Sequence, residues 1–295
     1  MKRIRFIKSS GTLVEKNVTK YCEQPEDQFI EMYLPDNEKY IVVDENEEAD
    51  ICFFSVQLED ESLLRSNELN IFFSIENYEH WGPLRGHYKH YNKFGVYGTK
   101  KKDICISSNH SIPSETPDYK IIPNIYCRIN HYEKVKEYWK QKYHVPFSEK
   151  KFVLFTSRNP ANQNKLTLHN LLEKVGDVHF IGEHKELENV SCYHSEEMIK
   201  VFSQYKFIVS FENSHNTGYI TEKIFNALLA QTIPIYDGAP DIDEFINKQR
   251  FIGCDKNIIQ KIKFLKDNEK MYNYMIEREA INEKYKNIKV DYSLK

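Results

Sequence analysis

The sequence of 295 residues lacks the features that mark several large classes of protein. No apolar run reaches the roughly 18 residues that a membrane-spanning helix needs. The basic residues 1–8 are not followed by the apolar stretch of a signal peptide. The six cysteines are scattered without a C-x-x-C pair, which argues against a disulfide framework and a zinc knuckle. We therefore expect a soluble, unexported protein in a reducing compartment such as the cytoplasm.

The chain also has no surplus of positive charge. It has 41 Lys and Arg residues and 44 Asp and Glu residues, so its formal net charge is −3. A general nucleic-acid binder needs a basic surplus to neutralise phosphates, so this class is disfavoured, although a local basic pocket stays possible. Hydrophobic residues make up 40% of the chain, which is enough apolar bulk for a folded protein. The length is typical of two domains.

Short apolar runs alternate with longer helical patterns, as in parallel α/β sheets. The expected strands cover residues 4–7, 40–43, 51–56, 69–75, 104–107, 152–156, 177–181, 206–211 and 232–236. The expected helices cover residues 131–143, near 163–175, 195–204 and 219–230, with a short helix from Asp241. The pattern predicts two Rossmann-like α/β domains that face each other across a cleft.

The composition changes around residues 142–151, where we place the domain boundary. We predict an N-terminal domain over residues 1–146, a C-terminal domain over 147–262, and a helical segment over 263–295 that packs back on the domains. The acidic stretch 44–50 is expected to be a solvated loop.

One segment carries most of the chemical information. Residues 207–211 are continuously apolar, which is typical of a central strand covered on both faces, and Glu212 and Asn213 follow at its carboxyl end. Ligands bind at this edge of open α/β sheets, where helix N-termini favour phosphate. Lys223 lies in the first turn of the next predicted helix and opposes its dipole, which an anionic ligand would explain. The alternative is a solvent-exposed lysine paired with a neighbouring glutamate.

Four pieces of this region together match a known signature in order and spacing. They are Tyr-Lys-Phe at 205–207, Phe-Glu-Asn-Ser at 211–214, Tyr-Ile-Thr-Glu-Lys at 219–223 and Ile-Pro-Ile-Tyr-Asp-Gly at 233–238. This composite resembles the alpha-1,3-fucosyltransferases, glycosyltransferase family ten. Weaker similarity extends over residues 152–160 and 71–77. The resemblance implies a GT-B architecture, with an acceptor-binding N-terminal domain and a C-terminal domain that binds GDP-fucose.

The resemblance also implies roles for individual residues. Lys223 would contact the diphosphate and Glu222 the ribose hydroxyls, while Asn213 and Tyr219 would contact the rest of the nucleotide sugar. Glu76 would be the general base, at the end of the strand over residues 71–75. An inverting transfer needs such a carboxylate to take the acceptor proton, and cations to absorb charge on the departing GDP.

Two positions depart from the family pattern. After the strand that leads to Asn159, which would also bind the donor, the family has an arginine where this chain has Lys165. Lysine keeps the charge but loses the bidentate fork, and Arg158 is a candidate to compensate. Ser-Ile at residues 74–75 replaces the small residues that the family shows before the base.

Other features suggest competing chemistry. The D-x-D at residues 241–243 resembles the metal-binding motif of another glycosyltransferase class, but we favour acidic residues that open a helix. His87 and His90 have no third metal ligand nearby in the sequence, so we favour a surface or acceptor-loop role. Trp81 is a candidate for an aromatic wall that binds the acceptor, although core packing accounts for it equally well.

The sequence thus predicts an inverting fucosyltransferase that needs no metal cofactor. It would move fucose from GDP-fucose to a hydroxyl of an N-acetylglucosamine-containing oligosaccharide. One alternative is a transferase of the same fold that uses another nucleotide sugar, because the expected donor-binding residues recognise the diphosphate more than the fucose. The other is a glycan-binding protein that has lost fucose-transfer activity. The departures from the family pattern at Lys165 and residues 74–75 keep this alternative open.

Overall fold

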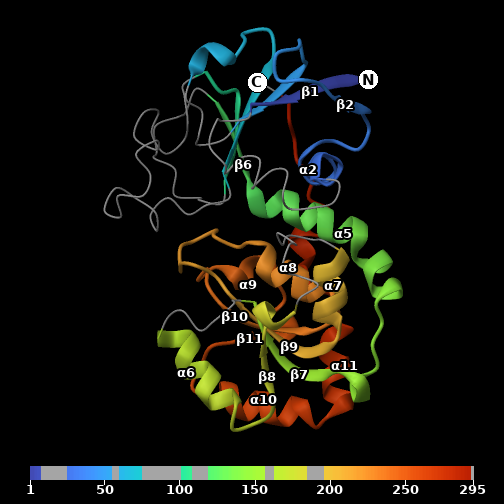
Figure 1. Ribbon diagram of the computed structural model, residues 1–295, viewed down its shortest axis with the longest axis vertical. Helices are drawn as coiled ribbons and strands as arrows, with labels where there is room; N and C mark the ends of the chain where they lie inside the picture. Colours follow the sequence, from blue (N-terminus) through green and yellow to red (C-terminus); the bar gives the residue numbers. More distant parts are fainter. Residues whose placement is uncertain are drawn as a thin grey trace. The chain divides into compact units, whose positions relative to one another are not determined.

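The computed structural model describes residues 1–7, 25–54, 60–74, 101–107, 119–156, 163–184 and 196–293. Packing divides the chain into two compact units. The first comprises residues 1–131, 216–219 and 288–295, and the second comprises residues 132–215 and 220–287. Each unit contains a parallel β-sheet with helices (Figure 1), which confirms the predicted α/β class. The predicted domain boundaries at residues 146 and 262 stay a prediction.

The sheet of the first unit has the strand order β2-β1-β3-β4-β5-β6. Its strands are β1 (Lys2–Phe6), β2 (Tyr40–Val42), β3 (Ile51–Phe54), β4 (Leu69–Ser74), β5 (Ile104–Ser107) and β6 (Lys120–Pro123). The first five were expected from the sequence. β6 was missed because its apolar run is only two residues long and ends in proline, which is tolerated at a sheet edge.

Helices α2 (Pro25–Tyr33) and α5 (Asn124–Lys142) accompany this sheet, together with a 3₁₀ turn over Glu61–Leu63. α5 begins before the predicted residue 131 and continues into the second unit. Phe29 of α2 packs on the sheet, with its ring centroid 5.5 Å from that of Phe6 and 5.0 Å from that of Phe53. These aromatic contacts make up much of the core on one face of the sheet.

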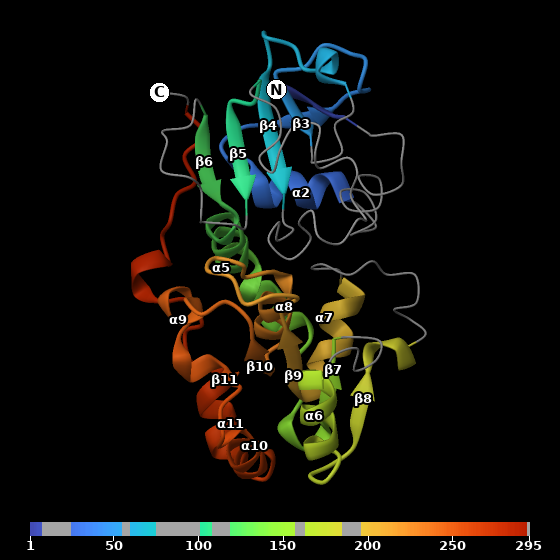
Figure 2. The same ribbon diagram turned by 90° about the vertical axis from the view of Figure 1, so that its left-hand side faces the viewer.

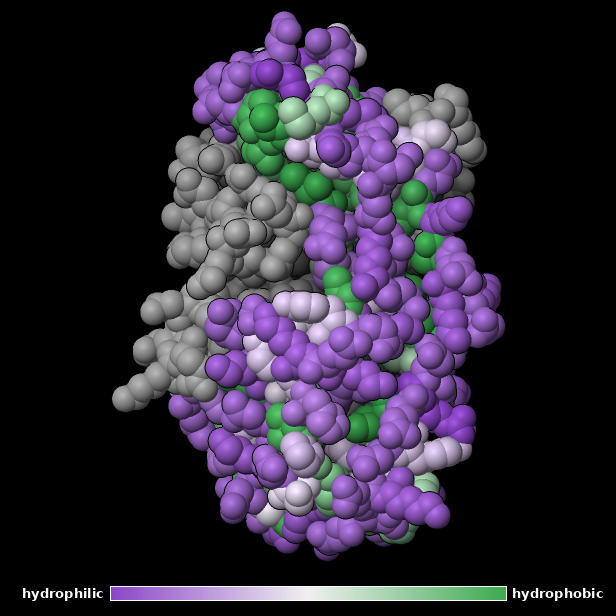
Figure 3. All heavy atoms as spheres, turned by 90° about the vertical axis from the view of Figure 1, so that its right-hand side faces the viewer, coloured by the Kyte–Doolittle hydropathy of each residue, from purple (hydrophilic) through white to green (hydrophobic). Residues whose placement is uncertain are grey.

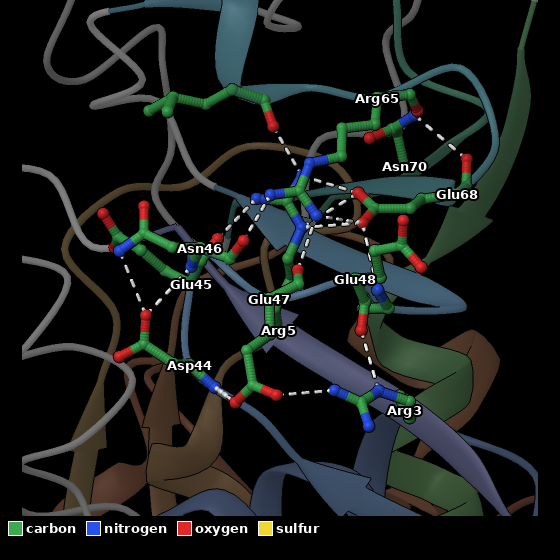
Figure 4. A network of polar contacts seen from close by, with 12 residues as sticks. Arg3, Arg5, Asp44, Glu45, Asn46, Glu47, Glu48, Arg65, Glu68 and Asn70 are labelled. Atoms are coloured by element: carbon green, nitrogen blue, oxygen red, sulfur yellow. Dashed lines mark hydrogen bonds and ion pairs between the residues drawn. The ribbon is translucent and has the colours of Figure 1, made fainter.

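Arg5 points to the other face of the sheet and forms a buried ion pair with Glu68 (Figure 4). The two side chains are 1% and 0% exposed, and Arg5 Nη2 lies 2.5 Å from Glu68 Oε2. Arg3, Arg5 and Arg65 also donate to main-chain carbonyl oxygens of the acidic loop. The acceptors, at 2.5–2.9 Å, belong to Glu45, Asn46, Glu47 and Glu48. The loop is exposed at most of its positions, as expected, and the arginines also hold its backbone.

The sheet of the second unit has the order β11-β10-β9-β7-β8. Its strands are β7 (Lys151–Phe155), β8 (Val178–Phe180), β9 (Tyr205–Phe211), β10 (Ile233–Asp237) and β11 (Ile252–Gly253). Its helices are α6 (Gln163–Leu172), α7 (Glu196–Ser203), α8 (Glu222–Leu229), α9 (Ile242–Phe245), α10 (Ile258–Lys266) and α11 (Glu269–Ile276). The predicted strands and helices of this part are present, and their ends shift by a few residues.

The segment over residues 263–295, which we expected to be helical, is helical only in part: α10 and α11 are followed by a 3₁₀ turn over Glu283–Tyr285, and residues 286–293 are not helical. α10 and α11 are separate because Asn268 caps α11, its side chain accepting a bond from the Met271 N–H at 3.0 Å. Ile258, Ile262, Leu265 and Tyr272 from this stretch are all buried in the core of the second unit. This part of the segment therefore packs back on the second unit, as expected.

Among the described residues, no helix combines the length and apolar character that a bilayer span requires. The face of the molecule in Figure 3 is largely hydrophilic, with apolar residues scattered over it.

Candidate functional site

Strand β9 leads into the centre of the candidate site. It lies between β10 and β7 in the sheet (Figure 2), and its residues 207–211 are buried, as the apolar run predicted. At its carboxyl end, the Glu212 N–H donates to the Asp237 carbonyl oxygen at 2.8 Å, so the ends of β9 and β10 stay paired. α8 begins ten residues later at this edge of the sheet, where parallel α/β proteins bind ligands.

Glu212 organises the start of α8. Its carboxylate is 0% exposed and accepts two bonds from Thr221, from the N–H at 2.7 Å and from Oγ1 at 2.6 Å. Lys223 Nζ lies 3.3 Å from Glu212 Oε2. Burial raises the pKa of Glu212, and the nearby Lys223 charge opposes that rise. Glu212 thus fixes both the cap residue and the lysine of the first turn.

Lys223 sits between two carboxylates. Its Nζ bonds to Glu222 Oε1 and to Thr221 Oγ1, both at 2.9 Å, and its side chain is 17% exposed. Glu222 is 2% exposed. The pairing with a neighbouring glutamate, which the sequence left open, is therefore present, and the buried Glu212 adds a second negative charge. These two carboxylates account for a cation in the first helical turn without an anionic ligand.

Lys165 brings a second ammonium group to the same edge. It lies in the first turn of α6 and is partly buried. Burial lowers the pKa of Lys165, the Lys223 charge lowers it further, and Glu212 raises it. The structure thus brings Lys165, Lys223 and Glu212 close enough to interact electrostatically. An anion bound beside both lysines would relieve their repulsion.

Gly238 is required by close packing at the site. A Cβ at this position would lie 2.5 Å from Glu212 Cγ and 2.6 Å from the hydroxyl of Tyr236. The Tyr236 hydroxyl accepts a bond from the Ala239 N–H at 3.1 Å. Gly238 therefore permits the approach of the β10–α9 turn to the buried carboxylate.

Asn213 and Tyr219 differ in their surroundings. Asn213 is exposed directly after β9. Tyr219 is 3% exposed and groups by packing with the first unit. The predicted roles of both residues at the nucleotide sugar stay predictions.

Sequence reasoning missed a second polar pair at this edge. His215 Nε2 lies 2.9 Å from Asp237 Oδ1, and the two side chains are 58% and 24% exposed. His215 lies four residues after β9 and Asp237 is the last residue of β10, so no local pattern in the sequence links them. Glu212 was noticed there only as a residue at the strand end.

Residues 145–289 match the family model "Glycosyltransferase family 10 (fucosyltransferase) C-term". The chain carries a glycosyltransferase family 10 domain. The cluster of Lys165, Glu212, Glu222 and Lys223 lies within this family 10 domain.

Several curated proteins are similar over this part of the chain. The alpha-(1,3)-fucosyltransferase of Helicobacter pylori is 31% identical over 136 residues, which are 44% of this chain and 28% of that protein. The GDP-fucose protein O-fucosyltransferase 3 of Xenopus tropicalis is 33% identical over 99 residues, 32% of this chain and 21% of that protein. The chain spans less than a third of the length of each.

The likeness to solved structures covers more of the chain. A crystal structure of an alpha1,3-fucosyltransferase superposes with a TM-score of 0.58 at 19% identity, over 95% of this chain and 82% of that chain. The complex of an alpha1,3-fucosyltransferase with GDP-fucose gives a TM-score of 0.56 at 21% identity, over 94% and 81%. This likeness confirms the predicted GT-B fold class.

Other predicted site residues lie outside the part of the chain that the structure describes. They are the general base Glu76, the donor residue Asn159 with its neighbour Arg158, and the acceptor residues Trp81 and His87, with His90. Their roles stay predictions.

The D-x-D of residues 241–243 opens a helix, as we expected. Asp241 occupies the N-cap position of α9, and Asp243 pairs with Lys248 at 2.6 Å. Within the described ranges, no group of three or more His, Cys, Asp or Glu residues is arranged to hold a metal ion. The expectation that the family 10 domain needs no metal stays a prediction.

Proposed function

We propose that this protein transfers fucose from GDP-fucose to a hydroxyl of an N-acetylglucosamine-containing oligosaccharide, with inversion at the anomeric carbon. The observation that carries the proposal is the pair of lysines at the carboxyl edge of a parallel sheet, within a family 10 domain. GDP departs as an anion, so the transition state gains negative charge at the diphosphate. Glu212 and Glu222 balance the charges of the two lysines. Lys165 and Lys223 would therefore stabilise that anion by direct charge-assisted hydrogen bonds.

The cluster gives each group a distinct task. Glu212 and Thr221 hold the start of α8, which keeps the Lys223 ammonium in one position before the donor binds. Such preorganisation costs no rearrangement during the reaction. Glu222 accepts a hydrogen bond from Lys223, and its carboxylate would also accept bonds from the ribose hydroxyls. Asn213, Tyr219 and Asn159 would contact the remaining donor groups.

Glu76 would remove the proton from the acceptor hydroxyl as that oxygen attacks the anomeric carbon. Glu76→Gln keeps the size of the side chain but cannot take the proton, so transfer should fall by roughly 100-fold or more while GDP affinity stays nearly constant. Transfer rates and GDP titrations on the same preparation measure both effects. Near-normal transfer by this variant would contradict the assignment of the base.

The decisive experiment for the function measures GDP release and fucose transfer with radiolabelled GDP-fucose on an acceptor array, with and without EDTA. We expect transfer to a glycan acceptor that survives EDTA. Transfer to protein acceptors alone would contradict the glycan assignment. Turnover of another nucleotide sugar, or GDP binding without any turnover, would replace the proposal by one of the two alternatives. Metal-reversible loss of transfer in EDTA would contradict the expected independence from metal.

A further inference from the structure

A cavity of about 450 Å³ opens in the second unit beside β11, the edge strand of its sheet. Residues of α10 and α11 form its other wall, and these elements lie next to β11 in Figure 2. Its volume falls within the range of roughly 300–1,000 Å³ that is typical of small-molecule sites. Lys165, Glu212, Glu222 and Lys223 do not line it, so it is separate from the proposed donor site.

The floor of the cavity is apolar. Phe251, Ile252 and Leu265 line it and are 9%, 3% and 6% exposed. Phe264 also lines it, and this side chain is 55% exposed. A single exposed aromatic residue is common on protein surfaces. Here, however, the ring borders a concave apolar surface, so a ligand can contact both.

Two ion pairs stand at the rim of the cavity. Asp243 and Lys248 are 2.6 Å apart, with side chains 40% and 71% exposed. Asp255 and Lys261 are 2.5 Å apart, with side chains 49% and 47% exposed. The four charges cancel, so the rim favours neither an anion nor a cation. The carboxylate oxygens and ammonium N–H groups remain able to bond to hydroxyl groups, since each has more than one bonding position.

A ligand that fits this surface is neutral, has an apolar face and carries hydroxyl groups around its edge. A pyranose ring has this combination, because its C–H groups form an apolar face and its hydroxyls project outward. We propose that the cavity binds a neutral saccharide, with the sugar ring on Phe264 and its hydroxyls bonded to the two rim ion pairs. This goes beyond the proposed transfer activity, because the cavity would hold a sugar away from the donor cluster.

Gly253 offers a direct way to block the cavity. It lines the cavity, and a Cβ built at this position meets no atom within 4 Å. Gly253→Leu should therefore fill the space without straining the fold. Phe264→Ala removes the aromatic surface. Tyr274→Ala is the matched control, because Tyr274 is an aromatic residue of α11 that is 48% exposed and does not line the cavity.

The test follows the amide resonances of β11 and α10 by NMR while the isotope-labelled full chain is titrated with N-acetyllactosamine in the absence of GDP. A sulfated form of the same disaccharide serves as the charged comparison. We expect saturable shifts with the neutral sugar in the wild type and in Tyr274→Ala, and weaker binding of the sulfated form. Phe264→Ala should bind at least tenfold more weakly, which corresponds to about 1.4 kcal/mol. Gly253→Leu should show no saturable shift.

Several results would overturn the proposal. They are the absence of shifts in the wild type, equal shifts in all four proteins, and stronger binding of the sulfated sugar. A wild-type dimer that Gly253→Leu converts to a monomer would assign the cavity to a second copy of the chain instead. GDP affinity, measured in parallel, should be the same in all four proteins. Failure of sugar binding with intact GDP binding and transfer therefore refutes this proposal and leaves the proposed function standing.

Discussion

Replacing Lys165 by methionine should affect stability and ligand binding in opposite directions. Burial and the charge of Lys223 lower the pKa of Lys165, so the folded protein holds this positive charge at a cost. A neutral side chain of similar length removes the cost. We therefore expect the free energy of unfolding without ligand to stay constant or to rise by up to about 1 kcal/mol.

GDP binding should weaken in the same variant. A hydrogen bond to a charged group contributes about 1.5–3 kcal/mol, so the loss of one ammonium contact to the diphosphate predicts roughly 10- to 150-fold lower affinity. Calorimetric titration with GDP and denaturant unfolding of the same preparation measure both quantities. Unchanged GDP affinity would refute the assignment of Lys165 to the diphosphate, and a large loss of stability would refute the electrostatic argument.

Lys165→Arg provides the control and a test of pH dependence. An anion binds the protonated lysine and raises its pKa, so GDP affinity is full below the pKa of Lys165 in the free protein and falls as the pH rises above it. Because that pKa is lowered, the decline should begin below the usual range for lysine. Arginine stays charged over this range. The arginine variant should therefore keep its affinity where the wild type loses it, and parallel pH profiles would contradict the argument.

Three further substitutions test the packing around the site and the first unit. Lys223→Ala leaves two buried carboxylates without their cation, so both GDP affinity, by about 100-fold, and stability, by about 3–5 kcal/mol, should fall; an unchanged melting temperature would contradict the observed pairing. Gly238→Ala places a Cβ 2.5 Å from a neighbouring side-chain carbon and should cost about 1–3 kcal/mol in denaturant unfolding; a cost below about 0.5 kcal/mol, as at ordinary surface sites, would show that the turn can relax. Arg5→Met should destabilise by about 3–5 kcal/mol. Adding Glu68→Leu should recover only part of that loss, because Glu68 also accepts bonds from Arg65 and from the Ala49 N–H; additive losses in this double-mutant cycle would mean that Arg5 and Glu68 do not act as a pair.

Most strands of both sheets could be predicted because their apolar runs are local in the sequence, whereas β6 and β11 were missed. The run over residues 207–211 is apolar except for the small Ser210, which is typical of a strand covered on both faces. The end of β9 could be predicted for the same reason, since Glu212 interrupts the run. The apolar run of β6 is only two residues long and β11 has only two residues, so neither strand has a comparable signal in the sequence.

The start of α8 shows where local sequence misleads. Tyr219 and Ile220 continue the apolar pattern of the helix, and we placed them inside it. Gly218 has a φ of 75°, and Thr221 has extended φ and ψ angles, so the chain turns before the helix begins at Glu222. That path depends on the bonds from Thr221 to a carboxylate nine residues earlier.

The electrostatics of the site were less accessible to sequence reasoning. The sequence predicted that Lys165 and Lys223 serve one site, through resemblance alone. It did not predict that Glu212 lies buried beneath Lys223, because a glutamate after a strand is usually exposed. Contacts between residues far apart in the chain, such as that of Arg5 with Glu68, leave no periodic signal.

The way in which arginines hold the acidic loop makes substitutions and deletions there unequal. Arg3, Arg5 and Arg65 bind the loop mainly by its carbonyl oxygens, which every amino acid supplies. Bonds to carbonyl oxygens do not limit most side chains of residues 44–48. The side chains of Asp44 and Glu47 are exceptions, because their carboxylates accept bonds from the N–H groups of Asn46 and Asp44, respectively. Deletion of a single residue would instead shift every later carbonyl away from its guanidinium partner, including the carbonyl that accepts the part-buried bond from Arg5. The loop should therefore tolerate substitutions better than changes in its length.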